Sequence, residues 1–191
     1  VTTWAKHLRD ALEGHPRYDV KLLHIVPEPY ESVDARDINV SSVEAAQQAI
    51  RNLAPLILLP NYMWELYLAG FEPGVSCIGM CHADSDEQYY RPLGWYEPTI
   101  SQFIAVSPEC AERLRERVPC RSEDITTLPY GIPVPPKTSR VDDSDCLRLV
   151  YAGRVTQLQK RVWDFVPLVD HLLEAGVRFR FDVYGDGDQF E

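Results

Sequence analysis

The sequence predicts an α/β protein: a parallel-sheet, Rossmann-like N-terminal domain followed by the first strand–helix–strand unit of a second Rossmann-like domain. Apolar runs of strand length alternate with amphipathic helical stretches along almost the whole chain, which is typical of a parallel sheet covered by helices. The alternation breaks once, at residues 133–145, where three prolines and a run of charges indicate a linker. We therefore divide the chain into an N-terminal domain at residues 1–132, this linker, and the incomplete start of a second domain at residues 146–191.

The first predicted element is a helix, because Trp4, Leu8, Ala11 and Leu12 share one helical face and Gly14 follows them. A parallel sheet of this kind normally begins with a strand and a tight turn. We therefore expect a strand to precede residue 1 in the complete protein.

The rest of the N-terminal domain continues the alternation. Apolar runs predict strands at residues 20–26, 56–59, 76–81, 103–106 and 125–128, and helical stretches at 62–69, 87–90 and 97–101. Ser41 and Glu44 form a capping-box pattern that predicts the start of one further helix. Ser107 as N-cap and Pro108 as the first helical residue predict another, which ends at Arg117.

The second domain shows three elements. We expect a strand at residues 147–152, a regular helix from about Trp163 to Gly176, and a strand in which Phe179, Phe181 and Val183 alternate. Three elements do not cover both faces of a sheet, so we expect this piece to pack against the first domain or against a partner.

Composition excludes several classes of protein. A net charge of −10 argues against nucleic-acid binding, which requires clustered Lys and Arg. No apolar run approaches the roughly 20 residues of a membrane-spanning helix, and no signal-peptide pattern is present. The five scattered cysteines are odd in number, which indicates free thiols in a reducing compartment. We therefore expect a cytoplasmic protein with no integral membrane segment.

The segment Gly153–Arg161 is the strongest candidate for chemistry. A predicted strand ends at Gly153, Arg154 follows at once, and Lys160 and Arg161 precede a predicted helix. Ligands of open α/β sheets bind at the carboxyl ends of strands, and helix N-termini attract anions. An Arg side chain can form hydrogen bonds to two phosphate oxygens, and a Lys side chain adds a single positive charge. These features favour phosphate binding, whereas the alternative is a solvated basic turn.

The same segment resembles the group 1, or family 4, retaining glycosyltransferases of the B-type fold (GT-B), which have two Rossmann-like domains facing a cleft. Further stretches are similar to the family's motifs and occur in the family's order: Ile104–Ser107, Ala111–Leu114, Leu128–Ile132 and Tyr184–Gly187. Tyr130 stands where the family usually has Asn.

The resemblance implies roles for particular residues. Gly153, Arg154 and Lys160 would hold the diphosphate of a nucleotide-sugar donor, such as a UDP- or GDP-sugar, without a metal ion or other cofactor. Gly185, Asp186 and Gly187 would lie close to the nucleotide.

The resemblance also implies roles in the N-terminal domain. His82 would be the catalytic-site histidine that faces the reacting sugar, and Asn61 would lie on the side of the acceptor, a carbohydrate or other small molecule. The alternative for His82 is a loop histidine hydrogen-bonded to Asp84. Asp84 and Asp86 also suggest a metal site, but acidic loop residues are usually solvated.

Two departures from the family pattern matter. The glycine-rich turn that precedes the family's first helix would lie before Val1, and its paired glutamates would lie beyond Glu191. We therefore expect a hexosyltransferase whose 191-residue part is inactive by itself. Because fold alone does not define function, a non-hydrolysing sugar-nucleotide epimerase and a non-catalytic binding module remain alternatives.

Overall fold

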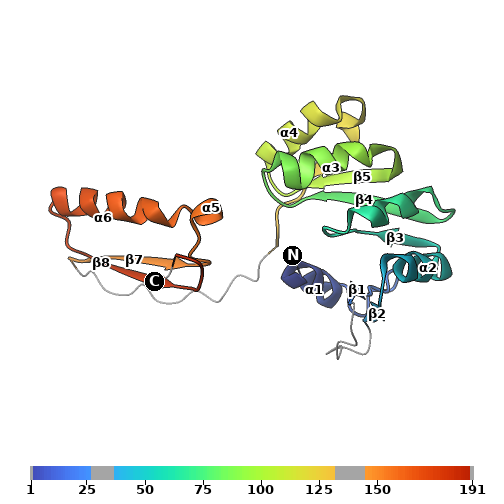
Figure 1. The fold of residues 1–191 in the computed structure, drawn as a ribbon, viewed down its shortest axis with the longest axis horizontal. Coiled ribbons are helices and arrows are strands. Elements are labelled where there is room, and N and C mark those ends of the chain that lie inside the picture. The colour runs from blue at the N-terminus through green and yellow to red at the C-terminus, as the bar shows by residue number, and fades with distance from the viewer. Residues whose placement is uncertain (1, 27–36, 132–144, 190–191) are drawn as a thin grey trace. The chain divides into compact units, whose positions relative to one another are not determined.

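A computed structural model describes residues 2–26, 37–131 and 145–189 (Figure 1). The chain forms two compact units, Val1–Pro133 and Val134–Glu191, which are described separately below as unit 1 and unit 2. Most of the predicted linker, residues 133–144, lies outside the described residues.

Unit 1 contains a four-stranded sheet in the order β3-β4-β5-β6, and every pair of neighbouring strands is parallel. The four strands are β3 (Leu56–Leu58), β4 (Val75–Cys81), β5 (Ile100–Ala105) and β6 (Ile125–Thr127). A second, two-stranded parallel sheet pairs β1 (Leu23–Ile25) with β2 (Ile38–Val40). This confirms the predicted α/β class with a parallel sheet of Rossmann-like type.

The helices of unit 1 are mostly short. They are α1 (Thr2–Ala11), α2 (Val43–Leu53), the 3-10 helix η1 (Trp64–Phe71), the π-helical turn η2 (Asp86–Tyr90), α3 (Arg91–Trp95), the 3-10 turn η3 (Glu97–Thr99), α4 (Pro108–Arg117) and the 3-10 helix η4 (Pro119–Asp124). Figure 1 shows α3 and α4 near β4 and β5.

Several predicted boundaries need correction. The cap of α2 is Ser42, not Ser41, because the Ser42 side chain accepts a hydrogen bond from the Ala45 N–H at 3.2 Å. Residues 97–101 do not form one helix, since β5 already begins at Ile100. Strand β2 was missed, because three residues are too few to show an alternating pattern. The prediction for α4 is confirmed, with Ser107 as its cap and Pro108 as its first residue.

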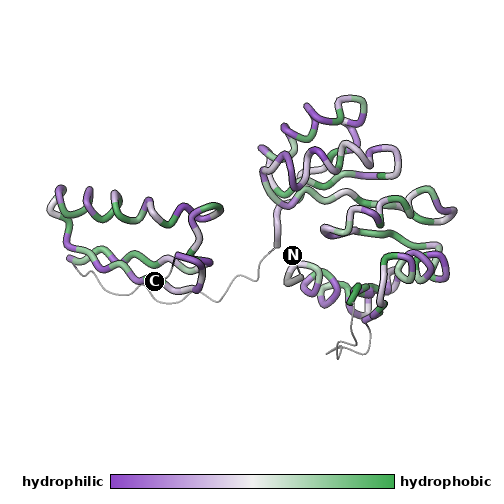
Figure 2. The backbone as a smooth tube through the Cα atoms, viewed as in Figure 1, coloured by the Kyte–Doolittle hydropathy of each residue, from purple (hydrophilic) through white to green (hydrophobic). Residues whose placement is uncertain are grey.

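The core of unit 1 lies between its sheet and the helices around it. Strand residues Cys77, Cys81 and Phe103 are fully buried, and so are Leu93 of α3 and Leu114 of α4. Figure 2 shows apolar residues along the strands and more polar ones on the helices. Burial of apolar side chains from both strands and helices stabilises the sheet and fixes the positions of its strand ends.

Unit 2 contains β7 (Leu147–Ala152), α5 (Gln157–Lys160), the 3-10 turn η5 (Val162–Asp164), α6 (Phe165–Glu174) and β8 (Phe179–Tyr184). Strands β7 and β8 are parallel and paired in register along their whole length. The Phe165 ring packs edge-on against the rings of Tyr151 and Phe181, with centroids 4.9 and 5.2 Å away, so α6 covers one face of this sheet.

The start of α6 shows how Pro167 is accommodated. Pro167 is the third residue of α6, in the first turn, where no backbone N–H has an intrahelical partner. The helix therefore begins two residues later than Trp163, the predicted start.

Candidate functional site

Three loops of unit 1 begin where parallel strands end. Asn61 follows β3, His82 follows β4 directly, and Tyr130 follows β6. Because the strands are parallel, their carboxyl ends lie at one edge of the sheet. The structure brings these three side chains together there.

His82 is held by hydrogen bonds on both ring nitrogens. Its Nε2 lies 2.7 Å from Oδ1 of Asn61, and its Nδ1 makes a short hydrogen bond with the Tyr130 hydroxyl. Since an amide oxygen only accepts, Nε2 carries the proton and donates. In the neutral ring Nδ1 is then an acceptor, so the hydroxyl of Tyr130 donates to it.

Four aromatic rings surround His82. Trp4 of α1 meets it edge-on at 5.4 Å between centroids, and Tyr89 of η2 lies at 5.8 Å. Tyr62 and Tyr130 are nearly parallel to the imidazole, at 27° and 18°. We call these four residues, together with His82 and Asn61, the His82 cluster.

Burial among these rings lowers the pKa of His82 from 6.5 to about 4. Removing the imidazolium from water disfavours the charged form. His82 is therefore neutral at pH 7, in agreement with its hydrogen bonds to Asn61 and Tyr130. The alternative in which His82 bonds Asp84 is wrong, since both ring nitrogens bond other residues, and Asp84 accepts the Tyr90 hydroxyl at 2.9 Å.

Tyr62 has a strained backbone. Its φ is 58°, in the left-handed region that a bulky residue seldom adopts. The buried Tyr89 hydroxyl donates to the hydroxyl of Tyr62, which helps to hold this conformation. Backbone strain of this kind is often found at functional sites, where surrounding contacts maintain it.

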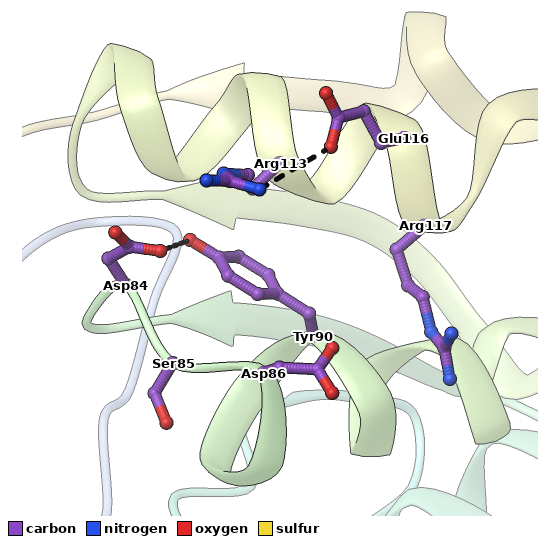
Figure 3. A pocket seen from close by; sticks show the side chains of 7 residues that line it. All are labelled: Asp84, Ser85, Asp86, Tyr90, Arg113, Glu116 and Arg117. Carbon is purple, nitrogen blue, oxygen red and sulfur yellow. Dashed lines mark hydrogen bonds and ion pairs between the residues drawn. The ribbon is translucent and has the colours of Figure 1, made fainter.

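A pocket of about 500 Å³ lies in unit 1 between the loop after β4 and helix α4 (Figure 3). It is lined by Asp84, Ser85, Asp86, Tyr90, Arg113, Glu116 and Arg117. Most of its charges are engaged: Arg113 pairs with Glu116 at 3.9 Å, and Asp86 pairs with Arg91 at 2.8 Å. Within the described residues, no three His, Cys, Asp or Glu side chains are grouped so as to hold a metal ion.

In unit 2, the two loops predicted to bind the donor lie in contact. The Gly153 N–H donates to the carbonyl of Tyr184 at 2.9 Å, and the Val155 N–H donates to that of Asp186 at 3.0 Å. A side chain at Gly185 would place its Cβ 1.8 Å from the carbonyl oxygen of Gly153. One at Gly187 would come within 2.2 Å of the Val155 carbonyl oxygen. Both glycines are therefore required by this close approach.

The basic residues of this loop are placed differently from the prediction. Arg154 and Lys160 are exposed, and Lys160 ends the one-turn helix α5 instead of preceding a long helix. Arg161 follows with a left-handed backbone and pairs with Asp164 at 2.9 Å. A helix of one turn has a small dipole, so the helix gives less support to the predicted anion site than the sequence suggests.

The predicted site residues thus form two groups. Asn61 and His82 lie together in unit 1, and in unit 2 Gly185 lies against Gly153 and Gly187 against Val155. Sequence reasoning missed the roles of Tyr62 and Tyr130, although each stands in a loop that follows a strand. Their positions after strands could have indicated a place in the site. The hydrogen bonds of Tyr130 to His82 and of Tyr89 to Tyr62 depend on the tertiary fold.

Comparison with known proteins adds no identity. No family model matches the chain, and no curated protein matches it. No helix in the described part of the chain combines the length and apolar character needed to cross a membrane.

Proposed function

We propose that this chain is part of a group 1 (family 4) retaining glycosyltransferase of the GT-B type, which moves a sugar from a nucleotide-sugar donor to an acceptor. Unit 2 would bind the donor, and unit 1 would supply His82 and Asn61 on the side of the acceptor. The contact between the Gly153–Val155 and Gly185–Gly187 loops is the observation that best supports the proposal.

The chemistry of the two loops in unit 2 fits a nucleoside diphosphate. Both loops leave the carboxyl ends of parallel strands, where α/β proteins bind nucleotides. Close backbone approach at the glycines holds the two loops together, and Arg154 and Lys160 supply positive charge in an otherwise acidic protein. That charge would stabilise the departing diphosphate as the glycosidic bond breaks.

Calorimetric titration of the full-length protein with UDP and GDP tests this proposal. We expect at least one nucleotide to bind, and Arg154→Ala and Lys160→Ala each to weaken its affinity roughly 10- to 100-fold, because a charge-assisted hydrogen bond is lost. Arg178→Ala is the matched control, since Arg178 is exposed just before the amino end of β8.

Two results would reject the proposal. One is the absence of heat with UDP, GDP and their sugar conjugates. The other is equal affinity in the two variants and the wild type. Interconversion of UDP-sugar epimers without transfer to any acceptor would assign the epimerase activity instead.

A further inference from the structure

The hydrogen bonds of His82 use all of its polar atoms. Its Nε2–H donates to Asn61, and its Nδ1 accepts from Tyr130. A neutral imidazole has one donor and one acceptor, so no ring nitrogen remains for a ligand. His82 in this state therefore holds its neighbours in position and does not itself contact a substrate hydroxyl.

The hydroxyl of Tyr130 is in a different situation. Its proton is donated to His82, which leaves the lone pairs of the oxygen available. Within the described part of the chain this oxygen makes no other hydrogen bond, and the residue is 42 % exposed. Tyr130 is therefore a partly exposed residue whose hydroxyl oxygen can accept a further hydrogen bond.

Tyr62, whose ring also stacks near His82, provides the complementary group. Its hydroxyl accepts the proton of the buried Tyr89, so its own proton remains available for a ligand. Tyr62 is 46 % exposed, and its ring is roughly parallel to that of His82. The two tyrosines thus offer one acceptor, one donor and two partly exposed aromatic rings, a combination that matches the hydroxyls and C–H face of a sugar ring.

We propose that Tyr130 and Tyr62 form a sugar-binding subsite of unit 1, in which the Tyr130 oxygen accepts a hydrogen bond from a ligand hydroxyl. His82 and Asn61 are positioning residues that fix the Tyr130 hydroxyl. The identification of the ligand as a sugar rests on the proposed function. The arrangement assigns the direct contact to Tyr130, the residue that departs from the pattern of the resembling family.

The test is NMR of the full-length protein with isotope-labelled tyrosine rings, titrated with the methyl α-pyranosides of glucose, mannose and galactose. We expect at least one glycoside to shift the Tyr62 and Tyr130 signals. Tyr130→Phe should weaken this binding at least tenfold, whereas Tyr18→Phe should not change it. Tyr18 is the matched control because it is similarly exposed, at 46 %, and packs on His15 outside the His82 cluster.

A double-mutant cycle tests the positioning role. If His82 acts through Tyr130, His82→Ala weakens glycoside binding in the wild type but adds little in the Tyr130→Phe background. Additive losses would show that His82 contacts the ligand directly and would overturn the assignment. No shift of the Tyr130 signals with any of the three glycosides would also overturn it.

These outcomes are distinct from those of the nucleotide titration. Glycoside binding at Tyr130 without nucleotide binding would reject the glycosyltransferase and keep the subsite. If the Tyr130→Phe variant still binds nucleotide and no glycoside shifts the tyrosine signals of the wild type, only the sugar-binding subsite is rejected.

Discussion

At the scale of single residues, the environment of His82 determines its protonation state. The rings of Trp4, Tyr62 and Tyr89 displace water from the imidazole, and the hydrogen bonds to Asn61 and Tyr130 fit its neutral form. The pKa of His82 falls from 6.5 to about 4. Between these two pH values His82 is therefore mostly neutral in the native state and mostly protonated in the unfolded state.

The pH dependence of stability follows from this depressed pKa. Well above pH 6.5 the residue is neutral in both states and contributes nothing to the pH dependence. As the pH falls from 6.5 towards 4, only the unfolded state gains the proton, so stability is lost. After allowance for partial exposure, we expect a loss of about 1 to 2 kcal/mol.

Denaturant unfolding of the wild type and of His82→Gln at several pH values measures this loss, because glutamine does not titrate and leaves all other groups unchanged. Asn61→Asp should raise the pKa of His82 by placing a carboxylate beside Nε2 and should reduce the loss. A constant difference between wild type and His82→Gln over the whole pH range would contradict the prediction.

At the scale of elements, helix α2 shows how local chemistry and geometry combine. Ser41 and Ser42 are adjacent, and either one reads as an N-cap in the sequence. Only Ser42 accepts the Ala45 N–H, because its backbone is extended where the helix begins. Helix α4 is unambiguous by comparison, since Pro108 fixes the first helical residue and makes Ser107 the cap.

Replacing these two serines separately tests the position of the cap. Ser42→Ala should lower the free energy of unfolding by about 1 kcal/mol, because one backbone N–H loses its partner. Ser41→Ala is the matched control and should change it by less than about 0.5 kcal/mol. Denaturant midpoints give both values. If Ser41→Ala lowers the free energy of unfolding more than Ser42→Ala does, Ser41 is the N-cap.

At the scale of the molecule, the two units differ in how much core they contain. Among the described residues, the buried side chains of unit 2 are Val155 and Val162, whereas unit 1 buries residues from β4, β5, α3 and α4. Within unit 2, Val150 and Tyr184 on the sheet face opposite α6 remain 64 % and 61 % exposed. Stability therefore depends mainly on unit 1.

Hydrogen exchange measured by mass spectrometry should resolve this difference. Amides of β4 and β5 should exchange slowest, and those of β7 and β8 should exchange at least tenfold faster, because opening of a sheet with one covered face exposes little apolar surface. Addition of a nucleotide that binds unit 2 should slow exchange in β7 and β8 and leave β4 and β5 unchanged. Equal protection of the two sheets without ligand would contradict the prediction.

The sequence by itself determined the α/β class, the parallel strands and the strand ends where Asn61, His82, Gly153 and Gly185 lie. Alternating apolar runs are local patterns, and parallel strands place such ends at one edge. Only the tertiary structure decided that His82 pairs with Asn61 and Tyr130, which are 21 and 48 residues away, and that it is neutral. The strand order β3-β4-β5-β6 creates these contacts. The burial that lowers the pKa of His82 depends on the packing of the whole unit and is not determined by any short segment of sequence.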